Sequence, residues 1–171
     1  MKRRWVPAPA PRDAGARVHG PLLLGEAPGI RAELDHVQAH AEPAGLALHV
    51  LVRAEGVQAE AARRQVSAEF REPLDPAGGR PDLGSRPVLR VAIGDLDDEV
   101  HPAPWAVRTH EDRATGEVRF SMEGRCWVDE LPADGRVRVS VSWRQAGLPE
   151  SHRTLVLPVG GPDVPDAPRP P

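Results

Sequence analysis

Apolar and polar side chains alternate along much of this chain, and the most informative alternation lies in residues 37–53. A turn at residues 42–45 pairs Ala41 with Leu46. It gives a hairpin with one apolar face, formed by Val37, Ala39, Ala41, Leu46, Leu48, Val50 and Val52. Successive side chains point to opposite faces of a strand, so the other face takes mainly histidine and glutamine. Because a slip of one residue would exchange the two faces, the pattern predicts an antiparallel hairpin with a buried and a solvated side.

The same alternation predicts further strands. They lie at residues 87–93, 105–109, 118–122, 137–143 and 154–159, and the second and third of these form another hairpin. Residues 21–24 are short and apolar, which indicates an edge strand. Leu34 is out of phase with Val37 and Ala39, so we expect a bulge near Asp35.

Two stretches depart from this pattern. Residues 57–70 place Ala59, Ala62, Val66 and Phe70 at helical spacing, although their last part also alternates. We predict one short helix around 57–70, with an extra strand as the alternative, and residues 65–71 fit either. Residues 95–104 are acidic and contain proline, which predicts a loop.

Seven or eight short strands separated by turns predict a mainly β fold, a two-sheet antiparallel β-sandwich of immunoglobulin-like shape. The inward positions of its core include Val139, Val141 and Trp143. We expect residues 20–159 to form the domain. Residues 1–19 are then a disordered Pro/Ala-rich arm, and residues 160–171 a disordered Pro-rich tail.

Composition and charge narrow the possible partners and cellular location. The net charge of −3 offers no general attraction to nucleic-acid phosphates or acidic membranes. The basic start is followed by proline rather than by the apolar run of a signal peptide, and no segment is long enough to span a bilayer. The single cysteine, Cys126, excludes an internal disulfide. These features predict a cytoplasmic protein.

Histidines supply the candidate metal site. His36, His40 and His49 all lie on the solvated face of the predicted hairpin. In the predicted register His49 is diagonal to both other histidines, at about 7–8 Å between backbones. The pair His40 and His49 is therefore our candidate for binding zinc or another transition metal, and three solvated histidines are the alternative.

Other groups of side chains have less support as functional sites. The acidic run Asp95, Asp97, Asp98 and Glu99 offers oxygen ligands for calcium but lacks the spacing of an EF-hand loop. Ser151 with His152, or Cys126 with a histidine, lacks an oxyanion-hole signature, and Cys126 fits better as a packed apolar side chain. Exposed tryptophans would suit a carbohydrate site. We assign no catalytic and no cofactor-binding residues.

The segment from Cys126 to Glu150 resembles a recurring pattern. An aromatic strand leads into the turn Leu131-Pro132-Ala133-Asp134-Gly135, a strand ends in Trp143, and the turn Gly147-Leu148-Pro149-Glu150 follows. In these residues the chain is similar to an uncharacterised actinobacterial β-sandwich family of unknown function. The abundance of alanine, arginine, glycine and proline also fits a GC-rich actinobacterial genome. The resemblance implies the sandwich fold and gives no information about activity.

Two functions remain open at this point. The first is a non-enzymatic protein-interaction or scaffold module that binds another protein through an exposed sheet face or edge strand, with neither nucleic acid nor membrane as a partner. The alternative is a metal-binding protein or metal-dependent enzyme that uses the hairpin histidines. Metal analysis of untagged protein separates the two.

Overall fold

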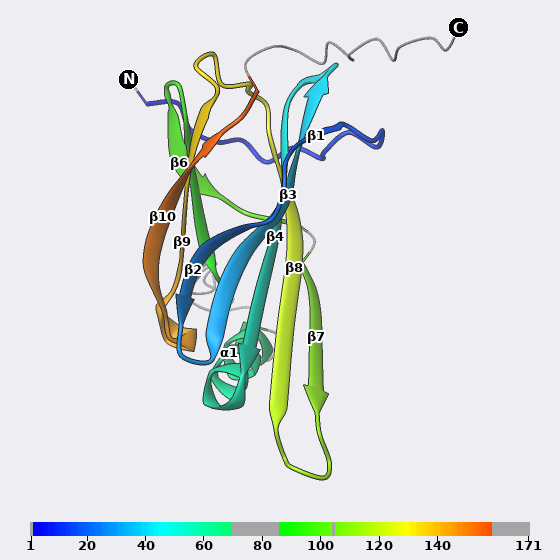
Figure 1. Cartoon of the computed structure of the whole chain (residues 1–171), viewed down its shortest axis with the longest axis vertical. Coiled ribbons are helices and arrows are strands. Elements are labelled where there is room, and N and C mark those ends of the chain that lie inside the picture. Colours follow the sequence, from blue (N-terminus) through cyan, green and yellow to red (C-terminus); the bar gives the residue numbers. More distant parts are fainter. Residues whose placement is uncertain (1, 70–85, 104, 159–171) are drawn as a thin grey trace, which may run out of the picture.

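The computed structural model describes residues 2–69, 86–103 and 105–158, which form two antiparallel sheets with a helix at one end (Figure 1). The elements in chain order are β1 (Ala16–His19), β2 (Leu22–Ala27), β3 (Ile30–Ala41), β4 (Ala44–Glu55), α1 (Gly56–Glu69), β5 (Val88–Ile93), β6 (Leu96–Val100), β7 (Trp105–Glu111), β8 (Val118–Val128), β9 (Arg136–Trp143), the 3-10 turn η2 (Arg144–Ala146) and β10 (Leu148–Val156).

The larger sheet has six strands in the order β1-β3-β4-β8-β7, and β2 pairs with the same strand, β3, as β1 does. The smaller sheet has four strands in the order β10-β9-β5-β6. The predicted two-sheet antiparallel sandwich is therefore confirmed. None of the helices in the described residues is long and apolar enough to cross a membrane.

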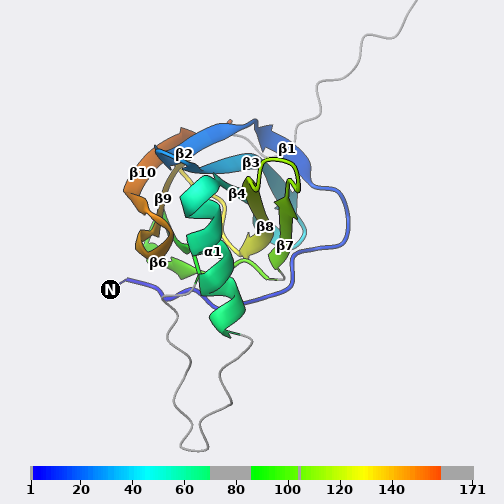
Figure 2. The same ribbon diagram turned by 90° about the horizontal axis from the view of Figure 1, so that it is seen from below.

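Apolar side chains of both sheets and of α1 share one core. The predicted inward residues Val139, Val141 and Trp143 are buried with Leu48 and Val50, as the alternation required. The predicted helix is also confirmed: α1 covers residues 56–69, and Phe70 lies outside the described residues. Three of its residues face the core, where the helix packs against β8, β4 and η2: Ala59, Ala62 and Val66. Seen from below, α1 crosses the space between the sheets and closes that end (Figure 2).

The first hairpin exists, but its predicted register is wrong by two residues. Leu46 pairs with Ala39 rather than with Ala41, and the turn consists of Glu42 and Pro43, joined by a cis peptide bond. A slip of two residues leaves each side chain on its predicted face, so the pattern could not detect it. Gly45 suggested a turn, but a Cβ there would lie 2.5 Å from the ring of Trp127. The expected bulge is present between Leu34 and His36.

The predicted loop at residues 95–104 is wrong in its first half, because β6 pairs with β5 there. Gly94 has φ +55 and makes the tight turn between the two strands. Leu96 and Val100 are buried, but Asp98 lies between them on the same face. That one acidic residue broke the alternation on which the prediction depended.

The N-terminal residues depart from the disordered arm that we predicted over 1–19. Residues 2–15 follow the outside of the sandwich, and β1 extends the larger sheet beside β3 (Figure 2). The physical reason is Trp5, which packs against the core although a proline-rich stretch follows it. The predicted tail at 160–171 lies outside the described residues.

Candidate functional site

The structure does not bring the two predicted metal ligands together. His40 is opposite Gly45 in the register, whereas His49 is opposite His36. Gly45 and His49 are four residues apart on β4, so the two histidines are separated by about 13 Å along the strand direction. His40 is also buried, edge-on to the Trp127 ring with 5.3 Å between ring centroids. Among the described residues there is no group of three potential ligands that could hold a metal ion.

Instead, His49 stacks on His36, with ring centroids 3.8 Å apart. The carboxylate of Asp35 lies 2.7 Å from Nδ1 of His36, and this hydrogen bond lowers the pKa of Asp35. Burial, together with the charges of His36 and Arg125, lowers the pKa of His49 to about 4. His49 is therefore neutral at pH 7 and packs as an uncharged ring on the outer face of the larger sheet.

The other chemical candidates have structural roles. Cys126 is buried, and burial raises its pKa to about 12, so it is a packed apolar side chain as predicted. The hydroxyl of Ser151 donates a hydrogen bond of 2.9 Å to the carbonyl of Leu24, which joins the two sheets. In the acidic run, Asp97 pairs with Arg90 and Lys2, and both bonds lower its pKa. Trp127 and Trp143 are buried and cannot line a carbohydrate surface.

The edges of the sheets differ more than their faces do. An edge strand presents unpaired backbone N–H and C=O groups to any extended segment that approaches it. On one side of the sandwich, β2 and β10 lie against each other and are tied by the Ser151 bond. Both strands also carry irregularities, between Leu23 and Gly25 and between Leu148 and Ser151. These two edges are closed.

The edge at β6 is covered by the N-terminal arm. Arg3 forms a parallel bridge with Leu96, and its backbone N–H donates to the carbonyl of Asp95 at 2.8 Å. The backbone N–H of Trp5 donates to the carboxylate of Asp98 at 2.9 Å, which lowers the pKa of Asp98. The arm therefore lies along this strand as a short extended segment.

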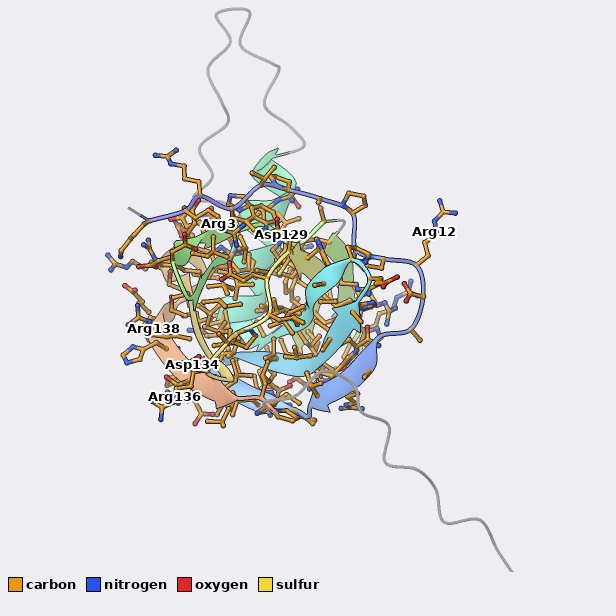
Figure 3. The ribbon with its side chains drawn as sticks, turned by 90° about the horizontal axis from the view of Figure 1, so that it is seen from above. Arg3, Arg12, Asp129, Asp134, Arg136 and Arg138 are labelled. Carbon is orange, nitrogen blue, oxygen red and sulfur yellow. The ribbon has the colours of Figure 1, made fainter. Side chains whose placement is uncertain are left out.

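The same arm fastens β6 to the larger sheet. The indole Nε1 of Trp5 donates to the carbonyl of Trp127, at the end of β8, at 2.8 Å. Arg3 forms ion pairs with Asp129 and Glu130, and Figure 3 shows its side chain beside Asp129. One segment thus closes the upper part of this side of the sandwich.

Two edges of the larger sheet remain, at β1 and β7. β1 is only four residues long and its register shifts between Arg17 and His19, whereas β7 is longer, regular and open. Its residues pair with β8 without a register shift, from Trp105 opposite Gly124 to Glu111 opposite Val118. Every residue from Ala106 to Glu111 is exposed, and no described strand pairs with its other side. The strand contains no proline and no bulge, which are two of the features that protect an edge. In Figure 1 it lies at one side of the larger sheet, below the arm.

The outer face beside β7 carries a row of cations. The register aligns Arg31, Arg53, Ser121 and Arg108 across β3, β4, β8 and β7. The next row contains Glu33 and Glu123, and the arginines pair with them at 3.0–3.5 Å. A hollow of about 580 Å³ lies over these strands; its charged lining residues are Glu26, Arg31, Arg53, Glu55, Arg108 and Arg119.

The chain matches no model of a known protein family, no curated protein and no solved structure. The open edge was also missed by sequence reasoning, although the strand at 105–109 was predicted. An edge is a property of strand order, and strand order depends on pairings between residues far apart in the chain. The only local signal is that β7 lacks a run of buried apolar residues.

Proposed function

We propose that this chain is a non-enzymatic protein-interaction module that binds an extended segment of another protein as an added strand beside β7. The observation that supports it is the contrast between the edges within the described structure: those at β2, β10 and β6 are closed, that at β1 is short and irregular, and β7 is regular, exposed and unpaired. In this mode of recognition, main-chain hydrogen bonds provide affinity and alternate side chains provide specificity.

A strand-binding edge has to be held rigidly by the sheet behind it. β8 supports β7 over its whole length, and β8 itself pairs with β4 from Val128 to Arg119. Phe120 and Met122 of β8 are buried in the core. β7 is thus a fixed template, which lowers the entropic cost of binding a flexible segment.

The alternative function through the hairpin histidines has less geometric support. Its candidate pair, His40 and His49, lies too far apart to share an ion, and His40 is buried beneath the arm near Gly15. The stacked pair His36 and His49 lacks a third ligand in the described residues.

The proposal can be tested with a library of random extended heptapeptides displayed on phage and selected on the immobilised full chain. We expect enriched peptides to shift the NMR amide signals of residues 105–111 and of their neighbours in β8. Selection that enriches no peptide would contradict the proposal. So would peptides that shift only the signals of α1, or of the smaller sheet.

A further inference from the structure

The two faces of β7 differ, and this difference determines which segment would fit beside it. Arg108 lies opposite Ser121 and points to the outer face, as do Ala106 and His110. Val107 lies opposite the buried Met122, so it points to the inner face, followed by Thr109 and, at the end of the strand, Glu111. A strand added beside β7 would set its own side chains alternately against these two rows.

The outer row favours acidic neighbours. Arg108 and His110 are the only ionisable side chains that β7 presents on this face. Arg108 remains 78% exposed although its guanidinium lies 3.2 Å from Glu123, and it retains donors that this ion pair does not use. The other arginines that line the adjoining hollow have glutamate partners: Arg31 and Arg53 pair with Glu33, and Arg119 pairs with Glu117. A carboxylate on the added strand would therefore find its cationic partner in the unused donors of Arg108 itself.

The inner row favours apolar neighbours. Val107 is 40% exposed although it lies beside the fully buried Met122, so the apolar inner face continues to the edge of the sheet without a cover. An apolar side chain on the added strand would remove this surface from water. β-branched residues suit this position because they pack well on a pleated surface.

A second copy of this chain fits the edge poorly. Two copies of β7 related by a two-fold axis can pair all seven of their residues only in the register that places Arg108, the central residue, opposite its own counterpart. Like charges placed directly opposite each other destabilise a strand pair. The occupant is therefore a segment with a sequence different from that of β7.

We infer that β7 binds a segment of another protein in which acidic and apolar residues alternate, with the acidic side chains beside Arg108 and His110 and the apolar ones beside Val107. This inference rests on the proposed function, because it specifies the partner of the same edge. It predicts the composition of the partner as well as its conformation.

The first test measures the affinity of the full chain for the blocked peptide Ser-Val-Glu-Val-Glu-Val-Ser and for three analogues. Replacing both glutamates by glutamine removes the cross-strand charge pair with Arg108 and should weaken binding about twofold to fivefold, and lysine should weaken it further. An analogue with proline as its central residue keeps the charge but cannot form a regular strand, so it should not bind measurably. Equal affinity of the glutamate, glutamine and lysine peptides would overturn the inference. Equal binding of the proline analogue would show attraction by charge alone and would also overturn it.

The second test reverses the charge on the protein. Arg108→Glu should weaken the glutamate peptide at least about threefold and strengthen the lysine peptide, because one cross-strand pair changes sign. Arg138→Glu is the matched control: Arg138 is exposed on the outer side of the smaller sheet (Figure 3), and both affinities should stay unchanged. Equal effects of the two substitutions would contradict a site at β7.

The outcomes separate the two proposals. One possible result is that the peptides selected from the library bind at β7 but lack alternating acidic residues, and that the glutamate peptide does not bind there. In that case the inference about the partner fails and the proposed function stands. If neither the library nor the glutamate peptide perturbs β7, the proposed function itself fails.

Discussion

Two edge strands, β6 and β7, differ in charge and in surroundings. β6 carries Asp97, Asp98 and Glu99, and the basic N-terminal arm lies along it. β7 presents Arg108 and His110 on its outer face, ends in Glu111 and is uncovered. The N-terminal arm on β6 is thus an example, within the fold, of an extended segment that closes an edge of opposite charge. This example indicates which features a partner of β7 should have.

The covered edge also shows which contacts hold such a segment in place. Lys2 and Arg3 form ion pairs at the surface, and exposed pairs of this kind contribute about 0–1 kcal/mol each. Trp5 adds packing against the core and two hydrogen bonds, to Asp98 and to the carbonyl of Trp127. By comparison, charge should select the partner of β7, and apolar contact with Val107 should supply much of its affinity.

The largest expected effect concerns the core on which both edges depend. Val139→Asp should lower the free energy of unfolding by about 3 kcal/mol or more, because it buries an unpaired carboxylate. Arg138→Asp, one residue away on the exposed face, should change it by less than about 0.5 kcal/mol. Urea denaturation measures both values. Equal losses would mean that the assignment of β9 to its two faces is wrong.

The next effect separates the two edges. Trp5→Ala should lower the free energy of unfolding by about 1–2 kcal/mol, because it removes packing and one hydrogen bond that joins the N-terminal arm to β8. Amide exchange in residues 96–100 should become faster, whereas exchange in residues 105–111 should not change. Unchanged exchange at β6 would show that the arm does not protect that edge.

The two regions should also respond to different ranges of pH. The pKa of His49 is about 4 in the folded state, below its ordinary value of 6.5, so only the unfolded chain takes up the proton between these values. Stability should therefore fall as the pH drops from 6.5 to 4, by about 1 kcal/mol or less because His49 is partly solvated. Denaturation of the His49→Gln variant should lose this slope.

At β6 stability should also fall as the pH drops, but over a lower pH range. Asp97 and Asp98 have pKa values below the ordinary 3.8, so their contribution is complete above that pH and is lost as the pH falls through the lowered values. A wild-type curve without a slope between pH 6.5 and 4 would contradict the half-buried, neutral state of His49.

The last prediction is that adding a metal ion has no effect on stability. Zinc in modest excess should leave the melting temperature unchanged, because His40 and His49 are not brought together. A bound ligand at 100 times its dissociation constant would add about 2.7 kcal/mol, which is easily seen. A zinc-dependent rise that disappears in the double variant His40→Gln, His49→Gln would restore the metal alternative.

The sequence was sufficient to predict the inward residues of a strand where one face of that strand is buried. The alternation placed Val139, Val141 and Trp143 in the core and located the bulge beside Asp35, because each depends only on side-chain parity. Parity could not distinguish two registers that differ by two residues, so the candidate pair of histidines was placed wrongly. It also missed β6, where Asp98 occupies an inward position and is satisfied by a backbone N–H from Trp5, far away in the sequence.

The candidate site was beyond sequence reasoning for a related reason. The residues of β7 predict a strand but not its neighbours. An open edge is recognised only when the other edges are seen to be closed, and each closure joins distant residues, such as Ser151 with Leu24.

Residue-by-residue amide exchange, with and without the peptide Ser-Val-Glu-Val-Glu-Val-Ser, compares the two edges most directly. The peptide should slow exchange at the amides of β7 that do not pair with β8, and it should leave residues 96–100 of β6 unchanged. Slower exchange at β6, or no change at β7 when the peptide is in excess, would contradict the account that one edge is closed by the chain itself and the other is kept for a partner.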